Sequence, residues 1–342
     1  MFINNVFTPL RVLNLIKIGV SYLLKLRKPF GVPTLLMIEP TNFCNLKCQL
    51  CPTGQNVLRV PKGMLQLVDF INLIDRQANY LTCIYFWMWG EPLLNNNIGK
   101  MVKYAKEKRI YTELSTNANI VGSEDSMSIE LVESGLDKLV VSVDGITEES
   151  YRLFREGGEL GKVVSFILAL VAAKQKLKSK SPYIDLQFII HRGNESEVGA
   201  VEKFARNLGV DGFSIKTLDL GISYLDSKDS EKNLHLLPIQ MNFGRYIKLD
   251  NNFKIKKQEN YCKRLWATCV VNWDGELSVC CNDPHRKISL GNVFRESLSS
   301  LWTTKNYQAL RQNLKSNDFC KNCTGSLNRE VVAQKNFNKN II

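Results

Sequence analysis

The sequence predicts an α/β fold: a partial (βα)6 TIM-like barrel followed by a small C-terminal cysteine-rich domain. From Leu35 onward, short apolar segments rich in β-formers alternate with helical patterns, which is typical of a parallel sheet covered by helices. Six such units can be counted. An open, partial barrel therefore fits better than a closed barrel of eight. The cysteine-rich domain is predicted because six of the ten cysteines lie from Cys262 to Cys323.

The predicted strands are short and evenly spaced. They span residues 35–38, 84–88, 111–114, 139–143, 184–190 and 213–216. In parallel α/β folds, ligands bind at the carboxyl-terminal ends of the strands. The residues directly after each strand are therefore the candidates for chemistry.

Composition excludes several classes of protein. With 342 residues, 44% hydrophobic and 23% charged, the chain is neither a disulfide-stapled miniprotein nor disordered. The net charge of +12 includes four lysines between residues 174 and 180. They close a predicted helix, so this run is interpreted as a solvated helix end, and nucleic acid is not expected as a partner. Ten cysteines without a cleavable signal peptide predict a reducing, cytoplasmic location.

Five segments are expected along the chain. Residues 1–31 form a basic amphipathic helix, 32–220 the partial barrel, 221–261 a linker, 262–330 the cysteine-rich domain and 331–342 a frayed tail. The first segment is expected to pack on the barrel. Peripheral contact with a membrane or a lipid-linked substrate is the alternative, because apolar and basic residues alternate along it.

A cysteine loop follows the first strand directly. Cys44, Cys48 and Cys51 are spaced C-x3-C-x2-C, and three soft thiolates can bind three irons of a four-iron cluster. The fourth iron would stay open to a substrate or cofactor. Zinc is the alternative, but zinc loops usually combine two cysteine pairs or add histidines.

This loop resembles the signature C-x3-C-x-φ-C of the radical S-adenosylmethionine (radical SAM) superfamily. After the second strand, Trp89-Gly90-Glu91-Pro92 is similar to the family's Gly-Gly-Glu-Pro motif. The resemblance implies that Gly90 and Glu91 bind the amine of SAM, where a carboxylate suits an ammonium group. Trp89 departs from the family pattern because it replaces a glycine.

Further motifs of the same family follow the next strands. Thr116-Asn117 is similar to the start of the Thr-Asn-Gly turn, with Ala118 in place of the glycine. The segment from Ser142 to Gly145 resembles Ser-x-Asp-Gly, and Asn194 follows the fifth strand. The resemblance implies that the SAM pocket is lined by Thr116, Asn117, Ser142, Asp144 and Asn194.

The C-terminal cysteines resemble the SPASM/Twitch domains that hold auxiliary 4Fe-4S clusters in this superfamily. A hairpin pattern around Asp274-Gly275 precedes Cys280. One cluster can be built from four cysteines, which are Cys262, Cys280, Cys320 and Cys323. By spacing alone, Cys281 could replace Cys280 and Cys269 could replace Cys262. A structural zinc ribbon is the alternative for the whole domain.

The resemblance implies a radical SAM enzyme with two 4Fe-4S clusters and SAM, which is cleaved to a 5′-deoxyadenosyl radical. The predicted reaction is the oxidation of a small molecule or glycan, in which the auxiliary cluster takes the second electron. Asp283 is the candidate acceptor of the substrate proton. A reductase, flavodoxin or ferredoxin is the expected electron donor. Modification of a ribosomal peptide, or a non-catalytic metal-binding protein, are the alternatives.

Overall fold

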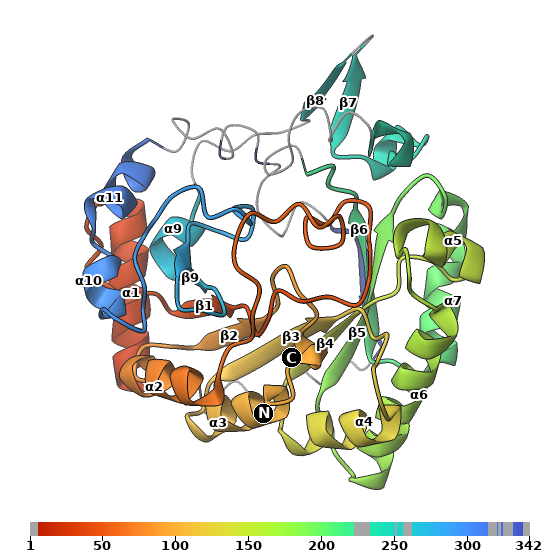
Figure 1. The fold of residues 1–342 in the computed structure, drawn as a ribbon, viewed down its shortest axis with the longest axis horizontal. Coiled ribbons are helices and arrows are strands. Elements are labelled where there is room, and N and C mark those ends of the chain that lie inside the picture. Colours follow the sequence, from red (N-terminus) through yellow and green to blue (C-terminus); the bar gives the residue numbers. More distant parts are fainter. Residues whose placement is uncertain are drawn as a thin grey trace.

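The fold is an open α/β sheet that is curved like part of a barrel, with helices on its outer side (Figure 1). The computed structural model describes residues 6–221, 233–249, 252–255, 262–313, 320, 323 and 331–337. Its main sheet has nine strands in the order β10-β9-β1-β2-β3-β4-β5-β6-β11. Adjacent strands from β9 to β6 in this order are parallel. The predicted fold class is therefore confirmed.

The six predicted strands form the centre of the sheet. They are β1 (Leu35–Ile38), β2 (Cys83–Phe86), β3 (Tyr111–Thr116), β4 (Lys138–Ser142), β5 (Tyr183–Ile190) and β6 (Gly212–Thr217). Fully buried side chains such as Leu36, Phe86 and Leu114 belong to one large core beneath the helices. Burial of these apolar chains is the main force that holds sheet and helices together.

Helices connect consecutive strands. They are α2 (Leu67–Gln77), η1 (Pro92–Leu94), α3 (Ile98–Glu107), α4 (Glu124–Glu133), α5 (Glu148–Phe154), α6 (Leu160–Lys176), η2 (Glu195–Ala200) and α7 (Val201–Asn207). Local signals set several starts. Ser123 caps α4, and Thr147 and Ser150 form a capping box on α5. The α6 helix ends in the lysine run, as the charge pattern predicts.

The C-terminal part of the chain extends the same sheet instead of folding apart from it. It contributes α9 (Arg264–Ala267), β9 (Thr268–Val271), β10 (Leu277–Ser278), α10 (Leu298–Leu301) and α11 (Lys305–Gln312). β9 pairs in parallel with β1, and β10 returns antiparallel to β9, which confirms the predicted hairpin. The edge of the barrel is therefore closed off by the cysteine-rich region.

Two of the five expected segments contain more structure than the sequence indicated. The expected tail contains β11 (Val331–Asn336), which pairs antiparallel with the free edge of β6. The expected linker contains η3 (Asn233–Leu236), η4 (Met241–Phe243) and an antiparallel pair formed by β7 (Tyr246–Leu249) and β8 (Asn252–Ile255). Residues 221, 237–240, 244–245 and 337 of these two segments are described outside these elements, and the others lie outside the described residues.

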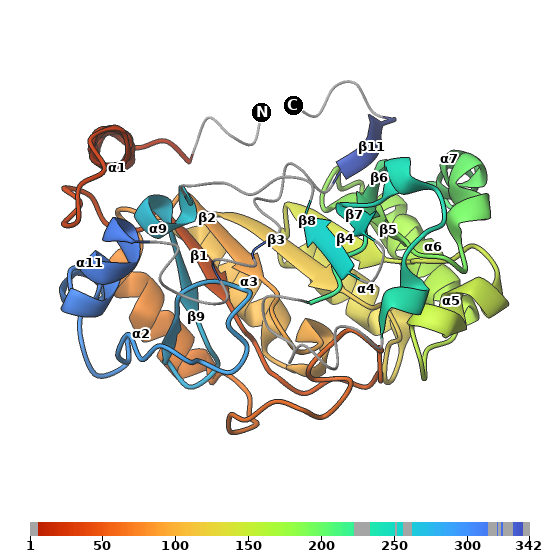
Figure 2. The ribbon, with the colours of Figure 1, turned by 90° about the horizontal axis from the view of Figure 1, so that it is seen from above.

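The N-terminal segment contains helix α1 (Pro9–Leu23), which begins after its cap Thr8 and has Pro9 in the first turn. Figure 2 shows α1 at the periphery of the molecule, beside α9 and α11. No helix among the described residues is long and apolar enough to cross a membrane.

Candidate functional site: two cysteine groups around one pocket

The cysteine loop after β1 is held at the carboxyl-terminal end of the sheet by polar contacts to two other loops. The amide of Lys47 donates to the carbonyl oxygen of Glu156 at 2.8 Å. The side chain of Asn45 donates to the carbonyl oxygen of Asn119 at 2.6 Å and accepts from Asn117 at 3.0 Å. These contacts fix the position of the loop, as a preorganised site requires.

The three thiols lie in a partly buried environment with cationic and polar neighbours. Asn117 Nδ2 donates to Cys44 Sγ at 3.7 Å, and Arg155 Nη1 donates to Cys48 Sγ at 3.8 Å. Burial raises the pKa of Cys44 to about 12 and also raises the pKa of Cys51. A thiol with a raised pKa keeps its proton unless another cation takes the place of that proton, and a bound iron is such a cation.

This donor set fits the predicted cluster. Among the described residues, no three Cys, His, Asp or Glu side chains are grouped tightly enough to bind one metal ion. In a four-iron cluster, by contrast, each cysteine binds a different iron, so the thiols need not converge on one point. Cys44, Cys48 and Cys51 are the residues that would hold it.

Position 90 requires glycine because the backbone of the cysteine loop passes very close to it. A Cβ at this position would collide with the carbonyl oxygens of Thr41 and Phe43 in the cysteine loop. Only glycine therefore lets the two motifs meet. The neighbouring Trp89, which stands where the family has another glycine, does not adopt a positive φ, so a side chain is tolerated there.

Glu91 lies where three segments meet. Its amide donates to Phe43 in the cysteine loop at 2.8 Å. Its carboxylate accepts from Thr116 Oγ1 at 2.7 Å, from the amide of Asn117 at 2.7 Å and from the amide of Leu93 at 3.1 Å. Burial raises the pKa of Glu91, and these donors oppose that effect. The carboxylate thus joins two of the predicted SAM motifs.

The turn after β3 uses a left-handed residue. Ala118 has φ of +57°, in the region that favours glycine. Its amide donates to Thr116 Oγ1 at 2.9 Å, which fixes the hydroxyl that bonds Glu91. The position therefore has the conformation expected from the family's glycine, although alanine occupies it.

Asp144 and Arg155 form a buried ion pair next to the cysteine loop. One carboxylate oxygen of Asp144 accepts from Arg155 Nε at 2.7 Å, and the other accepts from the amide of Ile189 at 2.6 Å. Burial disfavours the charge of Arg155, but Asp144 and then Cys48 raise the pKa of this guanidinium above its usual value. The pair thus places a permanent cation beside Cys48.

Asn194 and Ser142 lie behind the predicted pocket. The amide side chain of Asn194 donates to the carbonyl oxygens of Asp144 and Ile189 and accepts from the amide of His191. Ser142 is buried at the end of β4, paired with Gln187. Direct contact of Asn194 and Ser142 with SAM remains a prediction, and the contacts here tie neighbouring strand ends together.

Five of the C-terminal cysteines gather in one region. Asn282 bridges two of them, because its amide donates to Cys280 Sγ at 3.3 Å and its side chain donates to Cys323 Sγ at 3.8 Å. The pKa of Cys320 is raised to about 12, mainly by burial and then by the charges of Cys323 and Cys262. The four predicted auxiliary ligands are therefore neighbours.

The two alternative ligands lie in different places. Cys269 is fully buried on β9, where its sulfur lies 3.6 Å from the hydroxyl of Tyr307. Cys281 lies beside Cys280, but its sulfur accepts from Arg264 Nη1 at 3.1 Å. Cys281 raises the pKa of Arg264 most strongly, burial lowers it, and Cys280 raises it further. The net effect is a raised pKa. The assignment of Cys262 and Cys280 as ligands stays a prediction.

Asp283 does not line the pocket. It is almost fully buried, and one carboxylate oxygen accepts from the amide of Lys287 at 2.9 Å. Burial raises the pKa of Asp283, and the amides of Lys287 and Ile288 oppose the rise. Its carboxylate lies close enough to Cys320 to affect the pKa of that thiol. The predicted role as a direct proton acceptor therefore gains no support from the pocket.

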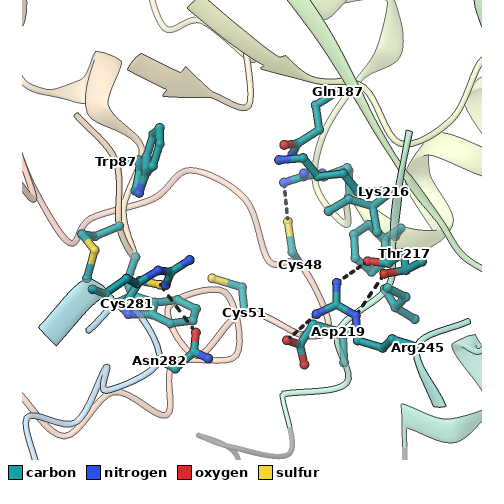
Figure 3. Close-up of a pocket in the computed structure, with 18 residues that line it drawn as sticks. Cys48, Cys51, Trp87, Gln187, Lys216, Thr217, Asp219, Arg245, Cys281 and Asn282 are labelled. Carbon is teal, nitrogen blue, oxygen red and sulfur yellow. Dashed lines mark hydrogen bonds and ion pairs between the residues drawn. The ribbon is translucent and has the colours of Figure 1, made fainter. Parts of the chain in front are cut away.

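One pocket of about 330 Å³ lies between the two cysteine groups. Cys48 and Cys51 line it from the first loop, and Cys281 and Asn282 line it from the C-terminal region. Figure 3 shows these four residues together with Trp87 and Gln187 around the same space. A substrate in this pocket would touch both segments that carry the predicted clusters.

The wall at the end of β6 was not predicted. Arg245 donates to Thr217 through Nε at 3.0 Å and to Asp219 through Nη1 at 3.0 Å, and all three line the pocket (Figure 3). Asp219 also accepts from the hydroxyl of Tyr246 at 3.1 Å. The position of Asp219 shortly after β6 could have indicated that it belongs to the site. Arg245 comes from the expected linker and carries no such signal.

Comparison with known sequence families agrees with these observations. The Radical SAM superfamily matches residues 38–186, and SPASM, an iron-sulfur cluster-binding domain, matches residues 262–324. A Pyrococcus furiosus protein named tungsten-containing aldehyde ferredoxin oxidoreductase cofactor-modifying protein is 25% identical over 299 residues. This alignment covers 81% of this chain and 82% of that protein. A GTP 3′,8-cyclase of Sinorhizobium medicae is 27% identical over 216 residues, which cover 62% of this chain and 58% of the cyclase.

Solved structures share the fold. SuiB of Streptococcus suis bound to precursor peptide SuiA has a TM-score of 0.63 at 15% identity, covering 88% of this chain and 71% of SuiB. Native anSMEcpe with bound AdoMet has a TM-score of 0.58 at 19% identity, covering 81% of this chain and 82% of that chain. BtrN with AdoMet and 2-DOIA has a TM-score of 0.51 at 19% identity, covering 86% and 93%. The chain therefore has a radical SAM domain and a C-terminal SPASM domain, which imply SAM, a 4Fe-4S cluster and auxiliary iron-sulfur binding.

Proposed function

We propose that the protein is a radical SAM oxidoreductase that removes two electrons and two protons from a small molecule or glycan. The observation that carries this proposal is the pocket that both cysteine-bearing segments line. When bound, SAM and its cluster would supply a radical able to take one hydrogen atom from the substrate, and an auxiliary cluster would supply an acceptor for the remaining electron. A substrate site between the two clusters suits this removal of a hydrogen atom by one and of an electron by the other.

The residues of the chain orient the substrate and control its environment. Trp87, Trp89, Phe154 and Leu218 give the pocket apolar surface, which excludes water from the reacting groups. Gln187 and Thr217 offer hydrogen-bonding groups at the ends of β5 and β6. A hydroxylated small molecule matches this mixture of apolar and polar wall.

We propose Asp219 as the acceptor of the substrate proton. Among the described residues that line the pocket it is the one carboxylate, and Arg245 and Tyr246 fix its orientation. A positioned carboxylate within reach of the substrate is a suitable general base. Asp283, the candidate from sequence, is instead proposed to act indirectly, through its place beside Cys320.

The relatives support a small-molecule substrate more than a particular compound. The name of the Pyrococcus furiosus relative describes modification of an enzyme cofactor, and the pocket has the mixed apolar and polar wall that is typical of small-molecule sites. Modification of a peptide is the second candidate, favoured by the fold that this chain shares with SuiB. A separate reductase, flavodoxin or ferredoxin is proposed as the electron donor.

A search for the substrate by mass spectrometry tests the proposal. Anaerobically reconstituted protein is incubated with SAM, dithionite and fractions of small molecules or peptides from the source cells, and 5′-deoxyadenosine is measured. We expect a small-molecule fraction to stimulate its formation, with one compound converted to a product about two mass units lighter. A product of unchanged mass would contradict oxidation. Conversion only in the peptide fraction would favour the second candidate.

A further inference from the structure

Helix α1 is oriented with its polar side toward the protein. Its buried residues are Arg11, Asn14, Ile18 and Ser21, three of which are polar. A helix at the surface of a globular protein normally buries its apolar stripe and exposes its polar side. The opposite arrangement here needs both an explanation for the buried polar groups and a role for the exposed apolar ones.

Arg11 explains the first half of this arrangement. Its guanidinium donates to the carbonyl oxygens of Ala78, Lys108 and Arg109, at distances from 2.6 to 3.2 Å. Ala78 and Lys108 are the C-caps of α2 and α3. The carboxyl-terminal ends of helices carry unpaired carbonyls and partial negative charge, so a buried cation is stabilised there.

Two further polar residues of α1 hold the chain that follows the helix. Asn14 exchanges two hydrogen bonds of 3.0 Å with the backbone of Val32, and Ser21 Oγ accepts from the amide of Phe30 at 2.9 Å. These contacts fix the rotation of α1 about its axis. Its opposite face must therefore point away from the protein.

That outward face is strongly apolar. Nine of the nineteen exposed large hydrophobic side chains among the described residues lie between residues 7 and 30. The residues that define the outward face of α1 are Leu10, Leu13, Ile16, Val20 and Leu23, together with its C-cap Leu24. Ile16 is 57% exposed and Leu23 is 76% exposed. Contiguous apolar surface of this kind marks a contact with a partner or a membrane.

The basic residues near this face indicate what kind of partner it binds. Lys17, Lys25, Arg27 and Lys28 are exposed beside the outward face, and the first acidic residue of the chain is Glu39. We propose that the outward face of α1 binds the surface of a lipid bilayer that contains anionic lipids. Apolar side chains would enter the interfacial region while the cations bind headgroups.

A second copy of the chain fits this surface less well. In a two-fold dimer through α1, the same basic residues would face each other without acidic partners. The helix lies beside the amino-terminal ends of β2 and β3, because Arg11 bonds the turns that precede these strands. The pocket lies at their carboxyl-terminal ends. A membrane-bound molecule would therefore keep its pocket open to the aqueous side.

Flotation with lipid vesicles tests this proposal on the reconstituted full chain. Vesicles of phosphatidylcholine with phosphatidylglycerol are compared with vesicles of phosphatidylcholine alone, at low and high salt. We expect binding to the anionic vesicles that high salt weakens. A Leu13→Gln, Ile16→Gln, Val20→Gln variant should bind at least about tenfold more weakly, because apolar area is lost. A Lys17→Gln, Arg27→Gln, Lys28→Gln variant should lose about a hundredfold on anionic vesicles.

A matched variant controls for apolar surface in general. Val68→Gln and Val121→Gln remove two exposed apolar side chains elsewhere, and this variant should bind vesicles as the unaltered protein does. All variants must keep the same circular dichroism and iron content. Absence of vesicle binding overturns the proposal, as does equal binding to both vesicle types. Dimerisation that the Leu13 variant abolishes, without vesicle binding, would assign the face to a second copy.

Discussion

Arg264 Nη1 donates to Cys281 Sγ at 3.1 Å at the edge of the pocket, while the adjacent Cys280 bonds the amide of Asn282. Two neighbouring cysteines thus have different surroundings. Cys281 faces the guanidinium and lines the pocket, whereas Cys280 lies near Cys323. Spacing alone does not reveal this difference, and the assignment of Cys280 as the auxiliary ligand stays a prediction.

The first prediction concerns these two thiols. Unaltered protein, purified anaerobically, should bind about eight irons, from two four-iron clusters. Cys280→Ser should lower this to about four irons, because the auxiliary cluster loses a ligand, whereas Cys281→Ser should retain about eight. Iron analysis together with electron paramagnetic resonance measures both. If Cys281→Ser loses the cluster and Cys280→Ser keeps it, the ligand assignment is wrong.

The second prediction concerns Glu39, which is buried where β1 meets the C-terminal hairpin. Burial raises the pKa of Glu39 to about 7, although Arg286 at 3.7 Å lowers it. An acid with a higher pKa in the folded state binds a proton there preferentially. The free energy of unfolding should therefore fall as the pH rises from about 4.5 to about 7, by up to about 3 kcal/mol from this group.

Urea unfolding at several pH values measures this contribution. Glu39→Gln should have a flatter dependence of unfolding free energy on pH than the unaltered protein, because the amide does not titrate. Glu133→Gln, at an exposed position on α4, should leave the dependence unchanged. An identical slope for the Glu39→Gln variant and the unaltered protein would show that this carboxyl does not titrate in that range.

The strands could be predicted because their signal is local. Alternation of apolar segments with helices gave all six barrel strands, and glycine at position 90 followed from a motif. The pairings of β9 with β1 and of β11 with β6 join segments more than a hundred residues apart. No local pattern encodes such contacts.

The site could be predicted only as far as its motifs. The loop cysteines and Glu91 stand in short sequence patterns, whereas Arg155 and Arg264 gain their roles from tertiary contacts with Cys48 and Cys281. Periodicity also reveals that α1 has two faces without telling which one is buried. The buried face is set by Arg11, whose partners are the ends of two other helices.

The third prediction tests Asp219 as the proton acceptor. Asp219→Asn should lower product formation about a hundredfold while SAM cleavage falls much less, because an amide cannot accept the proton. The rate of product formation is compared with the yield of 5′-deoxyadenosine, using the substrate found in the mass search. Asp125→Asn, an exposed carboxylate on α4, serves as the matched control.

A structural role for Asp219 would give a different result. If its main task is to hold Arg245, the Arg245→Lys and Asp219→Asn variants should affect substrate affinity alike and leave the ratio of product to 5′-deoxyadenosine unchanged. That outcome would contradict the assignment of Asp219 as a base. A fall in that ratio for Asp219→Asn but not for Arg245→Lys would support it.

The last prediction addresses the auxiliary cluster. A Cys320→Ala, Cys323→Ala variant should bind about four irons, retain SAM cleavage, and lose product formation to a much greater extent, because the substrate radical lacks its electron acceptor. Cys83→Ala, which removes a half-buried thiol from β2, is the matched control. Loss of a cluster can also unfold the domain that depends on it, so circular dichroism and SAM binding must first be unaltered. If cleavage and product formation then fall in the same proportion, the cluster positions the substrate or supports the fold, and oxidation loses its main support.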